Sequence, residues 1–138
     1  MVSTEPGPEA WEELLGAAGG EVARTARQAR VVADEAIPDA VEEFDAAARM
    51  LAFTFAPGTY KGLIAGVVPH ARHVNLMFSE GVALEPYDTG GLLTGTGKRA
   101  RHIKLHGPED AADPGVAELL SVAARRRREQ LQQRPPRR

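Results

Sequence analysis

Residues 74–105 begin with Val74-Asn-Leu-Met-Phe78, continue through Gly90-Gly-Leu-Leu-Thr-Gly-Thr-Gly-Lys-Arg-Ala-Arg101 and end with His102-Ile-Lys-Leu105. In the first and last runs apolar residues alternate with mostly polar ones, which is the period of a half-buried β-strand. The segment between them is rich in glycine and carries three cations, Lys98, Arg99 and Arg101. We therefore expect two strands joined by a glycine-rich loop, with a polar strand face beside that loop.

The same period of two extends toward the N-terminus. It predicts strands over residues 51–55, 60–68 and 72–78, with turns at Pro57-Gly58 and Pro69. A further strand is predicted over residues 101–106.

Helical patterns flank the predicted strands. Residues 9–18 and 21–36 are rich in alanine and glutamate and are separated by Gly19-Gly20, which predicts two helices. Pro38 suits the first turn of a third helix. That helix would present one apolar stripe at spacings of four and three, made by Ile37, Val41, Phe44, Ala48 and Leu51. A last helix is predicted from Pro114, with Val116, Leu119, Leu120 and Ala123 as its inner stripe.

These elements together predict the fold class. Short turns between strands favour antiparallel pairing, and helices gathered toward both ends of the chain favour an α+β fold over an alternating one. We expect a two-layer sandwich in which an antiparallel sheet of four to six strands carries the N- and C-terminal helices on one face. The expected domain covers residues 9–124, between a disordered lead-in of residues 1–8 and a basic helix end and tail, residues 125–138.

Composition limits the classes of function. The chain has 138 residues and no cysteine, which excludes disulfides, thiolate metal sites and thiol catalysis. No apolar run approaches the roughly 20 residues of a membrane span, and the N-terminus lacks the plan of a secretory signal. We therefore expect a cytoplasmic protein without a membrane partner. Charge is uneven, because residues 1–50 hold 11 acidic and 4 basic residues, whereas the segment from Arg125 holds 7 arginines and one glutamate.

Five short motifs resemble the YdhG-like domain of bacterial proteins. They are Val74-Asn-Leu-Met-Phe78, Gly81-Val-Ala-Leu84, Gly91-Leu-Leu93, Gly95-Thr-Gly-Lys-Arg99 and Arg101-His-Ile-Lys-Leu105, within a similarity that spans residues 37–124. The resemblance implies a compact α+β domain with a curved antiparallel sheet. It also implies a family of largely unknown function, of which some members are described as frataxin-like iron chaperones. Thr94 stands where the family usually has glutamate, so any chemistry that relatives place on that carboxylate is lost or moved here.

The glycine-rich loop is a candidate anion site, although it matches neither common phosphate motif. A P-loop needs glycine five residues before its Gly-Lys-Ser/Thr, but Leu92 and Arg99 occupy the corresponding positions. A dinucleotide loop leads into a helix, whereas Gly95-Thr-Gly97 leads into a predicted strand. Backbone amides and cations of such a loop can still bind an anion. The alternative is a structural turn with solvated cations.

Histidines on the predicted polar strand faces suggest a metal site. His102 and His106 are four residues apart, roughly 13 Å along a strand, which is too far to share one ion. His73 and His102 can share one if their strands pair in register. The alternative is a solvated polar face, and His70 is expected to be a surface residue.

The other candidate metal site is acidic. Glu35, Asp39, Glu42 and Glu43 are spaced by three and four residues, so they would share one side of a helix. Their oxygen ligands would suit weakly held iron, in line with the frataxin-like interpretation. The alternative is an ordinary solvated helix face.

We expect a binding domain rather than an enzyme, because no spacing of serine, histidine and carboxylate supports catalysis. The expected partner is a small anionic ligand or a protein, with no particular oligomeric state. The arginine tail can contact phosphates, but the acidic remainder of the chain argues against nucleic acid as a partner. The candidate ligand-binding residues are His73, Asn75, Gly95, Gly97, Lys98, Arg99, Arg101, His102 and Lys104. The alternative function is that of an iron-binding protein or iron chaperone, with iron held by the four acidic residues.

Overall fold

The computed structural model describes residues 8–133 of the chain. In chain order the elements are α1 (Pro8–Ala18), α2 (Gly20–Ala36), β1 (Val41–Asp45), β2 (Met50–Thr54), β3 (Leu63–Pro69), β4 (Val74–Phe78), α3 (Gly81–Leu84), the 3-10 helix η1 (Glu85–Tyr87), β5 (Leu93–Thr94), β6 (Arg101–Leu105), α4 (Pro108–Ala111) and α5 (Pro114–Gln132). The predicted lead-in lies outside the described residues apart from Pro8, which begins α1. Residues 134–138 of the predicted tail also lie outside them.

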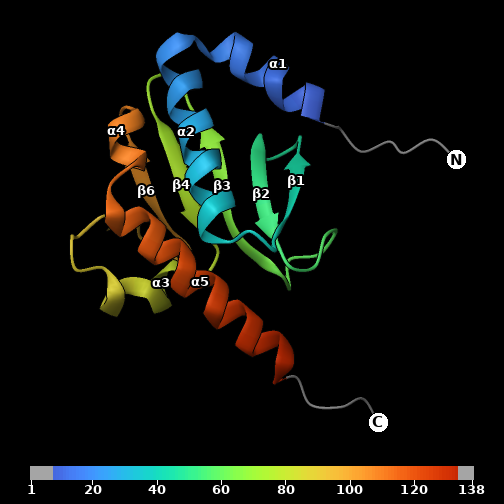
Figure 1. Cartoon of the computed structure of the whole chain (residues 1–138), viewed down its shortest axis with the longest axis vertical. Coiled ribbons are helices and arrows are strands. Elements are labelled where there is room, and N and C mark those ends of the chain that lie inside the picture. The colour runs from blue at the N-terminus through green and yellow to red at the C-terminus, as the bar shows by residue number, and fades with distance from the viewer. Residues whose placement is uncertain (1–7, 134–138) are drawn as a thin grey trace, which may run out of the picture.

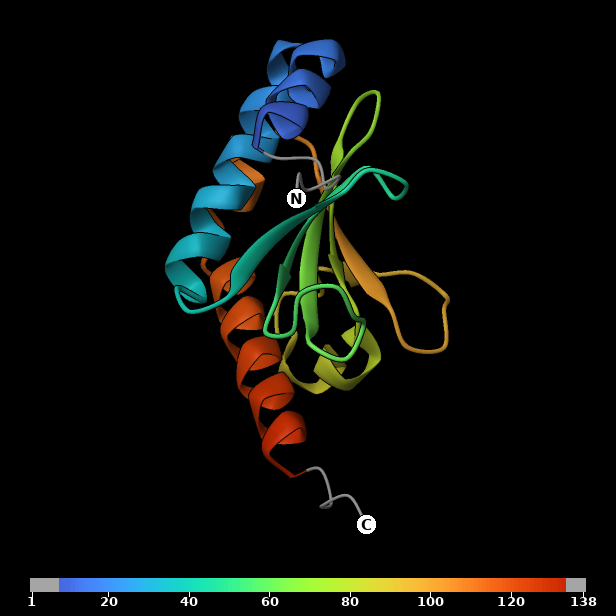
Figure 2. The same ribbon diagram turned by 90° about the vertical axis from the view of Figure 1, so that its right-hand side faces the viewer.

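The strands form one antiparallel sheet in the order β1-β2-β3-β4-β6-β5. The long helices α1, α2 and α5 lie on one side of it, and no long helix formed by residues 8–133 covers the other side (Figure 1, Figure 2). This arrangement confirms the predicted α+β sandwich with terminal helices on one face. None of the described helices is long and apolar enough to cross a bilayer.

Strand register determines which residues face away from the helices, on what we call the open face. One row crosses the sheet through Glu43, Ala52, Gly66, Met77 and His102, and a neighbouring pair joins Asn75 to Lys104. The middle of this face is apolar, because Met50, Ala52 and Leu63 form a small buried cluster with Val68 and Met77 packed against it. The open face therefore has an apolar centre between an acidic side at β1 and a basic side at β6.

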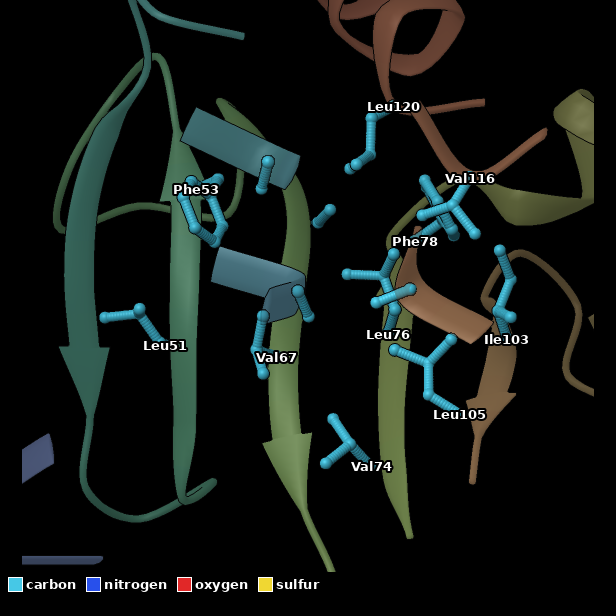
Figure 3. Close-up of a cluster of buried hydrophobic side chains, with 14 of the residues drawn as sticks. Leu51, Phe53, Val67, Val74, Leu76, Phe78, Ile103, Leu105, Val116 and Leu120 are labelled. Carbon is cyan, nitrogen blue, oxygen red and sulfur yellow. The ribbon is translucent and has the colours of Figure 1, made fainter. Parts of the chain in front are cut away.

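The main core lies between the sheet and the helices. Because side chains alternate along a strand, every second residue faces this side. There the apolar strand residues pack against the inner surface of α5 (Figure 3). The labelled members are Leu51, Phe53, Val67, Val74, Leu76, Phe78, Ile103, Leu105, Val116 and Leu120. Trp11 closes the core at the β1 side, where its ring meets that of Phe44 edge-on with centroids 6.1 Å apart. The core fixes one face of each strand, and the intervening residues are left to the open face.

The third predicted helix does not exist, and residues 37–51 instead form a turn and most of a hairpin. Phe44 and Leu51 still reach the helix side of the sheet, through strand pairing rather than through helical spacing. Val41 is 47% exposed, and Ala48 lies in the turn between β1 and β2. The carboxylate of Asp45 stabilises that turn by accepting the Ala48 N–H at 3.1 Å.

Most other predicted elements are confirmed with small shifts of their ends. The predicted strands appear as β2, β3, β4 and β6, and the predicted first, second and last helices appear as α1, α2 and α5. In α5, Val116, Leu119 and Leu120 are buried as expected, while Ala123 is only partly buried. The short elements α3, η1, β5 and α4 were not predicted.

Candidate binding site on the open face

The basic side of the open face gathers four histidines, one asparagine and one lysine. We call this group the histidine face, and its members are His70, His73, Asn75, His102, Lys104 and His106. Asn75 on β4 lies opposite Lys104 on β6, and Met77 lies opposite His102. The sequence therefore predicted correctly that polar residues of β4 and β6 would share one side of the sheet.

His73 has different neighbours from those expected. Because Val74 pairs with Leu105, His73 lies at the end of the strand pair, where its ring is 6.2 Å from that of His106 between centroids. It also stacks on His70, with centroids 4.7 Å apart and planes inclined by 18°. The condition that His73 and His102 lie in register is not met, because His102 pairs with Met77. His70 is exposed, as expected, and its contact with His73 is seen only in the tertiary structure.

Two of these imidazoles have a lowered pKa. The pKa of His73 is lowered by burial and then by the nearby His70, Lys104 and His106, with a smaller opposing effect of the Asn75 amide. The pKa of His102 is lowered by burial and by the charges of Lys104 and His70. No carboxylate contributes to either shift. Both rings are therefore mainly neutral at pH 7, and the field at this face favours an anion over a cation.

Asn75 has an incompletely satisfied amide group. Its Nδ2 lies 3.2 Å from Nε2 of His70, whereas its Oδ1 is buried and has no hydrogen-bond partner. A buried polar atom without a partner is unfavourable by about 1–3 kcal/mol. The free Oδ1 is an acceptor, so it can receive a hydrogen bond from a donor such as a water molecule but not from an anion.

Hydrogen bonds of the Arg101 side chain hold the glycine-rich loop in place. Its guanidinium donates to the carbonyl oxygens of Gly97 at 2.5 Å and Ala100 at 2.8 Å, and its Nε donates to Glu85 at 3.2 Å. The Arg101 side chain is only 14% exposed. The structure thus gives Arg101 a structural role, while Lys98 and Arg99 are exposed.

The loop still lies beside the histidine face. Gly95 has a φ of +129°, and a Cβ added there would lie 3.6 Å from Nδ1 of His102. The left-handed conformation explains the glycine at this position. The close approach puts the loop backbone within reach of any ligand that contacts His102.

The four acidic candidates do not share a helix face. Glu35 is exposed on α2, and Asp39 in the following turn pairs with Arg128 at 2.6 Å. Glu42 and Glu43 are neighbours on β1 and point to opposite sides of the sheet. Within residues 8–133, no group of three histidine or acidic side chains is placed to hold a metal ion.

Glu42 instead takes part in a charged cluster that the sequence did not reveal. It accepts two hydrogen bonds from Arg30 of α2, at 2.7 and 2.6 Å. Partial burial and the adjacent Glu42 carboxylate raise the pKa of Asp34 to about 6, whereas Arg30 lowers the pKa of Glu42. This cluster joins α2 to β1 on the helix side, away from the open face.

The arginine run near the C-terminus also has structural partners. Arg127 donates to the Leu63 carbonyl oxygen at 3.0 Å and to Oγ of Ser79 at 2.9 Å. Arg128 pairs with Asp39, and its guanidinium lies 4.8 Å from the centroid of the Phe55 ring. Ser79 itself donates to the Leu63 carbonyl oxygen at 2.6 Å, so its hydroxyl serves the fold.

In comparisons with protein-family models, with curated proteins and with solved structures, nothing matches the chain.

Proposed function

We propose that this protein is a non-enzymatic binding domain for a small anionic ligand, which it holds on the histidine face beside the glycine-rich loop. The observation that carries the proposal is the position of Lys104 among the histidines of this face, with no carboxylate among the groups that shift the pKa of His73 or His102. Lys104 is exposed at the centre of the group and directly opposite Asn75. A small anion placed there would gain a full positive charge and imidazole N–H donors.

One further feature supports an anion at this position. Lys98 and Arg99 add exposed positive charge in the adjoining loop. The motif residues of that loop support the related proposal that the chain is a YdhG-like domain.

The acidic iron site is not proposed as an alternative, because its four carboxylates are dispersed. Glu42 is paired with Arg30, Asp39 is paired with Arg128, and Glu43 accepts the N–H of Gly58 at 2.9 Å. A weakly held iron ion would need several free oxygen ligands at one point.

The test is an NMR titration of the histidine ring signals with inorganic phosphate and with citrate at low ionic strength. We expect saturable shifts at His73, His102 and His106. Lys104→Ala should weaken binding about fivefold, because one nearby charge at a surface contributes about 1 kcal/mol.

Lys61→Ala is the matched control, since Lys61 is an exposed lysine of the segment between β2 and β3. It should leave the affinity unchanged. Titrations in which neither anion shifts the histidine signals, or in which the two lysine variants behave alike, would overturn the proposal.

A further inference from the structure

We propose a second site, in a hollow at one end of the sheet, for a small organic carboxylate with an apolar body. The hollow has a volume of about 530 Å³ and lies between the end of α1, the β1–β2 turn and the start of the β3–β4 turn. Figure 2 shows these two turns projecting at the end of the sheet where α1 lies. This proposal goes beyond the phosphate-like ligand of the histidine face, because its main contact is Arg49.

The lining of the hollow indicates the chemistry of the ligand. Among residues 8–133, the polar side chains that line it are Arg49 and His70, and Val68, Pro69 and four alanines supply the rest of the lining. Its volume is within the 300–1,000 Å³ typical of small-molecule sites, which combine apolar walls with a few polar groups. An apolar wall with a guanidinium and an imidazole fits a carboxylate on a short hydrocarbon.

Arg49 is free to bind such a ligand. Its side chain is exposed and forms none of the ion pairs found among residues 8–133. Asp45 begins the same turn, but its carboxylate accepts the Ala48 N–H. A guanidinium binds a carboxylate through two parallel hydrogen bonds, which a lysine ammonium cannot reproduce.

The backbone at Arg49 is a second, independent observation. With a φ of +52°, Arg49 is the one non-glycine residue within residues 8–133 that has a positive φ. Glycine adopts this left-handed conformation without strain, whereas a residue with a Cβ is destabilised there. The chain therefore carries a long cationic side chain at a position where glycine would favour folding, which indicates that the side chain has a use.

The experiment follows backbone amide signals during titration with sodium butyrate, with n-butylamine as the oppositely charged probe. Butyrate should shift amides of residues 17–18, 48–49 and 70–71, and butylamine should not. Arg49→Gly should weaken butyrate binding about tenfold through loss of the guanidinium pair. The same variant should raise Tm by about 3 °C, because it relieves the left-handed arginine. Arg49→Lys should bind with intermediate affinity.

Arg72→Ala removes another exposed arginine, in the β3–β4 turn, and should change neither butyrate affinity nor Tm. The inference is overturned if butyrate shifts no amide around the hollow, or if Arg49→Gly binds butyrate as well as the unmodified protein does. Lys104→Ala should leave butyrate binding intact. Failure at the hollow is thereby distinguished from failure of the histidine face, which phosphate and citrate report.

Discussion

Gly81 lies against the backbone of Arg101, where β6 begins. A Cβ added at Gly81 would lie 2.6 Å from the Arg101 backbone nitrogen and 2.9 Å from its Cα. These are backbone atoms of a strand, so they cannot turn aside as the end of a side chain can. We predict that Gly81→Ala lowers the free energy of unfolding by about 2–3 kcal/mol, as overpacking of a core does, measured by urea denaturation.

Gly16→Ala is the control for that substitution. Gly16 lies within α1 and a Cβ added to it would meet nothing within 4 Å. The alanine should raise the free energy of unfolding by about 0.5–1 kcal/mol through helix propensity. If both alanine variants change stability in the same direction, the close contact at Gly81 does not have the effect assigned to it.

At the scale of elements, Arg127 links the C-terminal half of α5 to the sheet through hydrogen bonds. Its guanidinium bonds the Leu63 carbonyl oxygen, Ser79 and Gln130, and its side chain is only 13% exposed. Arg127→Ala leaves a carbonyl and a hydroxyl with one partner fewer, so we predict a loss of about 2–3 kcal/mol of unfolding free energy. Urea denaturation measures this loss.

Arg125→Ala tests whether the loss of stability in Arg127→Ala comes from the hydrogen bonds of Arg127 or only from its positive charge. Arg125 is an exposed neighbour on the same helix, so its removal should change stability by less than about 0.5 kcal/mol. Equal losses in the two variants would contradict the role given to Arg127. They would instead indicate a general effect of positive charge near the end of α5.

The elements that could be predicted from sequence are those whose pattern has one explanation. Alternation in β4 and β6 has the period of a strand and no competing helical period, so both were found. In residues 37–51 the spacing of Ile37, Val41, Phe44, Ala48 and Leu51 fits a helix. Strand pairing nevertheless prevails, because β1 gains backbone hydrogen bonds along the edge of β2 and places Phe44 against Trp11. Such a contact between distant residues leaves no signal in local spacing.

The candidate site shows the same limit. Alternation was sufficient to put Asn75, His102 and Lys104 on one face, because it depends only on position within a strand. It could not supply the register between β4 and β6, which places His106 rather than His102 beside His73. The sequence analysis did not identify Arg49 as a ligand-binding residue. Its proposed role comes from a backbone angle and a surface hollow, and a residue pattern shows neither.

At the scale of the whole molecule, charge is separated across the open face. The chain has a formal net charge of −2 with its histidines neutral, yet the histidine face holds Lys104 and four imidazoles. The carboxylates of Glu43 and Asp45 lie at the far side, on β1. Attraction of an anion therefore depends on the local field near β6, which acts over about one Debye length, roughly 8–10 Å at physiological salt.

This separation leads to a prediction about pH. In the free protein, burial and neighbouring cations lower the pKa of His73 and of His102, so both rings resist protonation until the pH falls below their ordinary value of 6.5. The unfolded chain binds protons at these two rings more readily than the folded protein does. As far as these rings are concerned, the free energy of unfolding is therefore highest above pH 6.5. It declines as the pH falls from 6.5 toward the lowered folded values.

A bound anion reverses the effect of the neighbouring cations. It raises the pKa of both imidazoles, so binding near pH 6 should be accompanied by proton uptake at the rings, and the affinity for sulfate, whose charge is constant over this range, should rise as the pH falls from 8 to 6. Calorimetry in two buffers of different ionisation enthalpy counts the protons taken up, and the His73→Gln, His102→Gln double variant should take up fewer. Binding that is equally tight at both pH values, with no proton uptake, would show that the anion binds away from these rings.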